Sequence, residues 1–407
     1  MTNLKKQIFS AMTAGALLLN VATPALAGTT LEISGNGSDS DNTVDVSTSN
    51  NTAVVQNNEA HVNNNIKVES NTGENTADDN TGGDVEIETG DADTEVNVSN
   101  SLNSNQASVD CCNDGDTEVK ISGNGSDSKN NVNLDMTNGE KSGVYQTNKA
   151  NVDNKVDVDS DTGDNDADDN TGGNVSIKTG DASTKVNVGT AANANSAKVG
   201  GNGDGGTLSA WITGNGSDSD NEIDLDLDNS TVVTQENDAN IDNDVDVDSD
   251  TGDNNADDNT GGDVVIETGD ADAEVSIDNM VNFNAADVDC GCTLDLTAKI
   301  AGNGTESDNK IKADVEGGSE VFQDNAICLD NSGDIDADTG DNDAEDNTGS
   351  VESDPSITTG DANTTVDVEN SGNANSYGED VDSEWPSFDF DFSFDFDLSD
   401  LLAALGM

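Results

Sequence analysis

The chain has 407 residues, a formal net charge of −71 and no arginine, so its 14 basic residues are all lysines. A polyanion of this kind offers no cationic surface for phosphates, which excludes nucleic acid as a partner and argues against anionic lipid headgroups. Leucine, isoleucine, valine and phenylalanine together amount to 78 residues, a content at the edge of the disordered class for a highly charged chain, so the order of the residues must decide whether the protein folds.

Residues 1–27 have the pattern of a secretory signal peptide. Lys5 and Lys6 precede an apolar run that closes on an Ala-x-Ala site, and cleavage is expected before Gly28. The alternative, an uncleaved membrane anchor, is disfavoured because the apolar run is short for a bilayer span. We therefore expect a secreted chain, extracellular or held at the cell surface, without a transmembrane segment after cleavage.

The rest of the chain is an internal repeat. Related GNG segments begin at Ile33, Ile121, Ile212 and Ile300, in steps of 88, 91 and 88 residues. Internal repetition at a fixed step indicates a repeat architecture before any single motif is considered. The predicted segments are the signal peptide 1–27, repeat 1 (33–120), repeat 2 (121–211), repeat 3 (212–299), a degenerate repeat 4 (300–380) and a C-terminal tail (381–407).

Within each repeat, apolar residues recur about every eleven positions, often as pairs two residues apart, as in a strand with one buried face. Asn36-Gly37 and its counterparts read as tight turns that need positive φ. These features predict an all-β, elongated β-solenoid of four tandem units, with coils of about 22 residues and four coils per repeat. The alternatives are an array of small β-sandwich domains or a largely disordered chain.

A Q-x-N-x-A-x-V line begins at Gln56, Gln146 and Gln235. It resembles the curlin-type repeats of secreted bacterial amyloids, and the resemblance implies glutamine and asparagine ladders running up a stacked β-structure. The line departs from that pattern in lacking the regular glycine and in carrying far more aspartate. Like charges at each stacked level oppose fibril growth.

Aspartates alternate with valines in the segment VDVDSD at residues 156–161, so the carboxylates should share one face of a strand. Stacked carboxylates repel one another, and Ca²⁺ accepts the oxygen ligands that aspartate, asparagine and carbonyl groups supply. The segment is not an EF-hand, because Gly163 comes one residue late. The alternative is a solvated acidic face with loosely held counter-ions. The candidate Ca²⁺ ligands are Asp157, Asp159, Asp161, Asp164, Asp166, Asp168, Asp246, Asp248, Asp250, Asp253, Asp257, Asp336, Asp338 and Asp341.

Five cysteines occur in a chain expected to be secreted, where disulfides are permitted. If coils held 22 residues, the first two groups would lie about 38 Å apart, so pairing is expected to be local or between molecules. The residues that could form disulfides are Cys111, Cys112, Cys290, Cys292 and Cys328.

His61 is the only histidine, and the equivalent positions of repeats 2 and 3 hold Asn151 and Asn240. No catalytic set can be assembled around a histidine that the other repeats lack, so we expect no enzyme activity.

The tail alternates phenylalanine with aspartate or serine, which places the rings on one face. We expect a docking strand for self-assembly or for a surface partner, with a cap over the last coil or a frayed end as alternatives. The docking residues are Phe388, Phe390, Phe392, Phe394 and Phe396.

Together these features predict a secreted, non-enzymatic structural protein of the bacterial cell surface or extracellular matrix, an acidic rod stabilised by Ca²⁺ and other divalent cations. The alternatives are a disordered polyanion that sequesters divalent cations and an adhesin that binds glycan or solid surfaces.

Overall fold

The computed structural model describes residues 17–21, 29–47, 52–109, 116–137, 142–200, 207–289, 295–349 and 355–378. Among these residues there is no helix, and therefore none long and apolar enough to span a membrane. The strands are β1 (Leu17–Val21), β2 (Thr29–Ser34), β3 (Asp41–Ser47), β4 (Ala53–Asn71), β5 (Val85–Glu88), β6 (Ala92–Val109), β7 (Thr117–Ser122), β8 (Lys129–Thr137), β9 (Ser142–Asp161), β10 (Val175–Lys178), β11 (Ala182–Gly200), β12 (Thr207–Thr213), β13 (Asp220–Asp250), β14 (Val264–Glu267), β15 (Ala271–Asp289), β16 (Asp295–Ala301), β17 (Asp308–Asp338), β18 (Ser356–Thr358) and β19 (Ala362–Tyr377).

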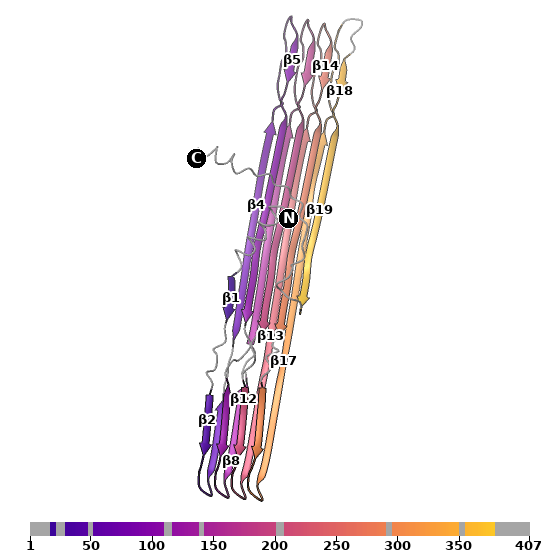
Figure 1. Ribbon diagram of the computed structural model, residues 1–407. Helices are drawn as coiled ribbons and strands as arrows, with labels where there is room; N and C mark the ends of the chain where they lie inside the picture. Colours follow the sequence, from indigo (N-terminus) through magenta and orange to yellow (C-terminus); the bar gives the residue numbers. More distant parts are fainter. Residues whose placement is uncertain are drawn as a thin grey trace, which may run out of the picture.

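Every repeat follows the same path (Figure 1). A short strand leads into the GNG turn, and the chain then runs outward along β3 and β4, β8 and β9, β13, or β17. It turns at a tip that carries the DDNTG segment. It returns through a short strand (β5, β10, β14 or β18) and a long one (β6, β11, β15 or β19). One repeat is therefore one long, flattened loop.

All sheets are parallel, and each strand except β1 pairs with its counterpart in the next repeat. Val156 on β9, for example, lies beside Val245 on β13. The long return strands form one sheet in the order β6-β11-β15-β19, with β1 added beside β6, and β17 joins the outward sheet through β13. The predicted coil of 22 residues is wrong, because the pairing step is a whole repeat. The alternative of independent β-sandwich domains is also wrong, since hydrogen-bonded strands belong to different repeats.

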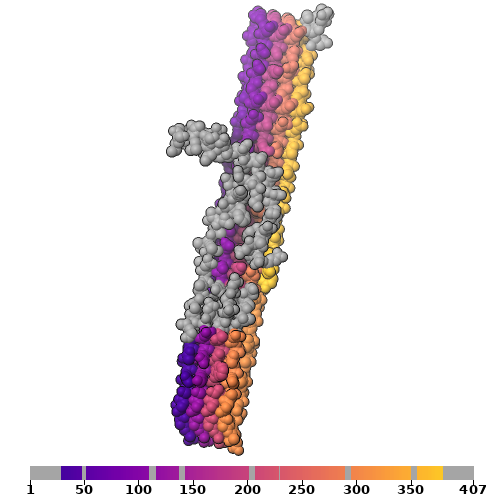
Figure 2. All heavy atoms as spheres, viewed as in Figure 1, coloured from indigo at the N-terminus to yellow at the C-terminus, as the bar shows by residue number. Residues whose placement is uncertain are grey.

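The molecule is elongated (Figure 2), and its long axis follows the strands drawn in Figure 1. The 31 residues of β13 span about 100 Å, whereas four stacked layers measure only about 19 Å. Coils of 22 residues would make the molecule long in the direction of stacking. The described residues are instead long in the direction of the strands. They also exclude a largely disordered chain.

The core is a thin layer between the outward and the return strands. Val156 and Val158 of β9 pack with Val186 and Val188 of β11, and all four are at most 1% exposed. Full burial of such a side chain stabilises a protein by about 1.5–3 kcal/mol. Because each repeat contributes the same positions, these small contacts continue through the layers.

Buried amides separate the apolar clusters along the strands. Gln146 donates to the Gln56 side chain at 2.8 Å, and Gln235 donates to Gln146 at the same distance. Asn148 similarly donates to Asn237 at 3.1 Å. The ladders that the curlin-type resemblance implied are thus present, and they keep buried polar groups hydrogen-bonded.

The GNG turns differ in detail from the prediction. Positive φ occurs at Gly35 (72°) and Asp39 (60°) rather than at Asn36-Gly37. The second glycine of the motif is needed in the later repeats for space, because a Cβ on Gly125 would overlap the backbone of Ser38 in the neighbouring layer. Stacking, not backbone conformation, requires glycine there.

The coil length from which the separation of the cysteine groups was predicted is also wrong. The strands that precede them place Val109 beside Val199 and Val199 beside Val288, so repeats 1 and 3 are only two strand spacings apart, about 9.6 Å. Cys328 on β17 is an exposed free thiol. The other four cysteines, Cys111, Cys112, Cys290 and Cys292, and the docking residues Phe388 to Phe396 lie outside the described residues.

Candidate cation site

The acidic face lies on the ends of β9, β13 and β17 that lead to the tips. Val156 and Val158 are buried, while Asp157 and Asp159 point to the opposite, partly exposed side. The alternation that predicted this division is confirmed. It follows from the period of two along a strand.

Stacking brings the predicted carboxylates together across layers. Asp159 lies between Glu69 and Asp248, and Asp248 in turn lies beside Asp336. Burial raises the pKa of Asp159 and of Asp248, and the neighbouring carboxylates raise both pKa values further. Like charges therefore accumulate along the stack, which favours protons or other cations between them.

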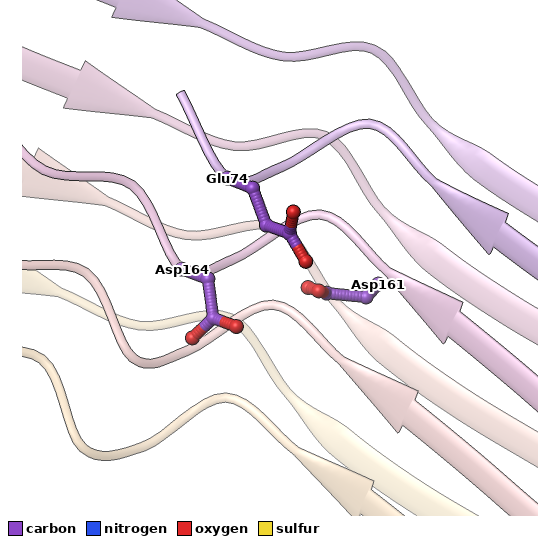
Figure 3. Close-up of side chains that lie close together, drawn as sticks. All are labelled: Glu74, Asp161 and Asp164. Carbon is purple, nitrogen blue, oxygen red and sulfur yellow. The ribbon is translucent and has the colours of Figure 1, made fainter. Parts of the chain in front are cut away.

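The tip cluster consists of Glu74, Asp161 and Asp164 (Figure 3). Glu74 comes from repeat 1 and the two aspartates from repeat 2, and one ligand oxygen of each lies within 4.8 Å of the others. Asn71 donates to Asp161 at 3.0 Å and holds that carboxylate from the side of repeat 1. Three oxygens of this kind suit a hard cation such as Ca²⁺ as a partial ligand set.

Asp161 and its counterpart Asp250 are held by the backbone. The amide of Gly163 donates to Asp161, and that of Gly252 to Asp250, each at 2.6 Å. Burial nevertheless raises the pKa of Asp161 to about 6 and that of Asp250 to about 7, and Asp164 and Asp253 respectively add to the rise. A bound cation would lower both pKa values, because it favours the charged form of each carboxylate.

The tip backbone holds the cluster in place. Asp164 and Asp253 adopt φ of 56° and 51°, a left-handed conformation that aspartate tolerates better than most residues. A Cβ on Gly163 would overlap the Gly252 carbonyl, so the layers can approach closely here only through glycine. The tips of successive repeats therefore repeat the same geometry.

A second acidic group lies further along the tip. Asp168 accepts from the backbone of Asp257 at 2.6 Å and from the Asn255 side chain at 3.0 Å. The Oδ1 atoms of Asp166 and Asn255, paired across adjacent layers, are buried and lack hydrogen-bond partners among the described residues. Burial, together with Asp168, raises the pKa of Asp166 to about 6. Two such acceptor oxygens fit the ligand preferences of a hard cation.

Other predicted ligands are arranged differently. Asp157 lies 3.5 Å from Lys67, and Asp246 lies 4.0 Å from Lys155, so lysines already compensate these two carboxylates. Asp338 and Asp341 hold the equivalent positions of the tip cluster in repeat 4, at the edge of the stack.

Sequence reasoning missed Glu74, because it assigned ligands within one repeat whereas the cluster forms between two. It also missed Asp278 on β15. Burial raises the pKa of Asp278 to about 7, and Glu369 and Asp367 on the adjacent β19 raise it further. Alternation of acidic and apolar residues in the return strands was the available signal.

His61 is exposed and lies 3.3 Å from Glu59, at the position that Asn151 takes in repeat 2.

No protein-family model matches this chain, and neither a curated protein nor a solved structure is detectably similar to it.

Proposed function

We propose that this protein is a secreted, non-enzymatic structural component of the bacterial cell surface or extracellular matrix. Its four repeats form the layers of an acidic β-solenoid that Ca²⁺ stabilises at the tips. The observation that carries the proposal is the tip cluster, in which Glu74, Asp161 and Asp164 of two different repeats place oxygens within 4.8 Å of one another.

The physical reason for a cation is repulsion between layers. Two carboxylates one strand spacing apart repel by roughly 1 kcal/mol even in a water-like dielectric, and more where burial excludes solvent. The stack that contains Glu69, Asp159, Asp248 and Asp336 repeats this arrangement at three successive contacts. A divalent ion that binds residues of two layers would convert a repulsive contact into a cross-link.

The protein's own composition supports a structural role. A flat, acidic, hydrogen-bonded body stays soluble in its extracellular setting and gathers divalent cations around it. The ordered strands of the described residues disfavour the alternative of a disordered polyanion that merely sequesters ions.

Thermal unfolding of the chain from Gly28 onward tests whether Ca²⁺ stabilises the fold. With chelator at pH 7.5 the midpoint should be low, and Ca²⁺ at micromolar to millimolar concentration should raise it more than NaCl of equal ionic strength does. In the triple variant Glu74→Gln, Asp161→Asn, Asp164→Asn, the rise caused by Ca²⁺ should be smaller, because the tip cluster loses its charge.

The matched control removes three carboxylates from exposed positions of β17, with Asp314→Asn, Glu316→Gln and Asp324→Asn. This variant should keep the full response to Ca²⁺. Equal responses to Ca²⁺ and NaCl, or equal losses in both variants, would show that the acidic face only collects counter-ions.

A further inference from the structure

Both ends of the stack are open sheet edges, except at residues 105–109 of β6, where β1 pairs. In repeat 1 the edge strands are β2, β3, β4 and β5, and in repeat 4 they are β16, β17, β18 and β19. Among the described residues, no further strand pairs with these eight. An open parallel edge presents unpaired backbone groups that are a template for another strand. Because the repeats are alike, the strand that fits each edge best is the edge at the opposite end of a second copy.

Apolar side chains that are buried inside the stack are exposed at the edge. Val366 on β19 is 51% exposed, whereas the equivalent Val186 of repeat 2 is fully buried. On the outer face, where Tyr145 of repeat 2 stays 39% exposed, Phe322 on β17 and Val55 on β4 are 56% and 72% exposed, and they hold the same register position in repeats 4 and 1. One more layer would bring these two side chains together.

Carboxylates and amides on β19 and on β6, the return strands of repeats 4 and 1, are placed in a complementary way. Extending the register by one layer places Asp93 opposite Asn363 and Asp367 opposite Asn97. The first type of contact already exists inside the chain, where Asn363 donates to Asp272 at 2.9 Å. No two carboxylates face each other between β19 and β6 in this register.

The outward strand of repeat 1 carries amides where later repeats carry carboxylates. Asn63 and Asn71 correspond to Asp153 and Asp161, and donate to them at 3.2 and 3.0 Å. In the extended register the same amides would also face Asp330 and Asp338 of another copy. Lys67 would face Asp334, and Lys312 would face Asp45, so ion pairs would form across the contact.

Two edge glycines fit the same arrangement. Inside the stack, a Cβ on Gly180 would overlap the backbone of Gly90, and one on Gly125 would overlap the backbone of Ser38. Gly37 and Gly90 are the equivalent residues of repeat 1, and a Cβ on either meets nothing within 4 Å in the chain itself. A second copy on this edge would give both glycines the close contact that their counterparts already have.

We propose that a second copy of this chain adds its repeat 4 edge to the repeat 1 edge of the first, in the register of the internal repeats. The product is a ribbon that grows along the stack, about 100 Å wide, with a rise of about 19 Å per copy. Glu69 would then face Asp336, just as like charges face one another inside the chain, so cations should favour growth. Growth does not depend on the tip cluster, because that cluster joins repeats 1 and 2 of a single copy.

A disulfide trap tests the register. Cys328 is exposed on β17, and the extended register places it opposite His61 of the next copy. Side chains at this position do touch in the internal layers, where Asn240 donates to Asn151 at 2.8 Å. In one chain, residues 61 and 328 are three layers apart, about 14 Å, which is beyond disulfide reach.

The variant His61→Cys of the full chain should therefore form a ladder of linked species on a non-reducing gel after mild oxidation. Mass spectrometry should identify the peptide pair that contains residues 61 and 328. The chain with native His61, and His61→Cys combined with Cys328→Ser, should lack this linkage.

The double variant Gly37→Ala, Gly90→Ala in the His61→Cys background should fold normally by circular dichroism but lose the linkage by at least tenfold. Gly318→Ala is the matched control, because a Cβ there meets nothing within 4 Å and the equivalent residue of repeat 3 is Ser230. It should keep the linkage.

Absence of the 61–328 linkage in the folded His61→Cys chain would overturn the proposal. So would assemblies that persist without this linkage and disappear when the tail phenylalanines Phe388 to Phe396 are replaced by serine. Full linkage in the Gly37→Ala, Gly90→Ala variant would also contradict it. Each of these outcomes is independent of whether Ca²⁺ raises the thermal midpoint.

Discussion

Asn154 and Asn243 are 89 positions apart, yet the side chain of Asn154 donates to that of Asn243 at 2.7 Å, and both residues are fully buried. Asn64 donates to Asn154 in the same way at 2.7 Å. This column of amides runs through the core and fixes the register of neighbouring repeats, since a shift by one residue would move every amide to the outer face.

Replacing Asn154 with alanine should lower the free energy of unfolding by about 1–3 kcal/mol, because the donor of Asn64 and the acceptor of Asn243 lose a partner without gaining water. Asn240→Ala is the control, since Asn240 makes a similar bond to Asn151 at an exposed position. Urea unfolding followed by circular dichroism measures both. Equal losses in the two variants would contradict a special role for the buried column.

Gly163→Ala should destabilise the tips, because the new Cβ would overlap the Gly252 carbonyl of the next layer. The chain must then separate the two layers locally, which also weakens the tip cluster. We expect a lower thermal midpoint and a smaller response to Ca²⁺, whereas Gly318→Ala, with open space around its Cβ, should change neither. A Gly163→Ala chain that behaves like Gly318→Ala would show that close tip stacking is unnecessary.

The stability of the folded chain should fall as the pH rises, because folding raises the pKa values of several carboxyl groups. Asp161 and Asp166 have pKa values of about 6, and Asp250 and Asp278 of about 7, against 3.8 for an ordinary aspartate. A raised pKa means that the folded chain favours the protonated form, so its stabilising effect is complete below about pH 4 and is lost as the pH rises through about 6–7.

Thermal scans in chelator from about pH 4 to about pH 8 should therefore show a falling midpoint, and Asp250→Asn should flatten the fall. Ca²⁺ should act in the opposite sense and bind more tightly as the pH rises, since the proton and the metal compete for the same oxygens. A midpoint that rises with pH in chelator would refute this account.

Strand β1 lies within the predicted signal peptide and pairs with β6, with Leu17 beside Asn105. In the extended register, Asn375 of a second copy would take the same place beside Asn105. A chain that keeps residues 1–27 should therefore assemble more slowly than one that begins at Gly28. Light scattering at equal concentration compares the two, and equal rates would show that β1 does not protect this edge.

Much of this organisation could be predicted from the sequence by itself. The repeat boundaries follow from the GNG segments, and the inner and outer faces follow from alternation such as Val156-Asp157-Val158. The alternation is a local pattern, and the GNG segments are recognised because they recur. Neither signal depends on how distant parts of the chain meet.

The length of the coil was decided by tertiary structure alone. Asparagine clusters such as 63–65 resemble turns in isolation, because asparagine favours turns. In β4 they continue the strand instead, since Asn64 points inward and finds its hydrogen bond on Asn154, in the next repeat. The tip cluster has the same origin: Glu74 meets Asp161 and Asp164 only when two repeats stack in register. Partners that lie 87–90 residues away leave no local pattern, so only the folded chain determines them.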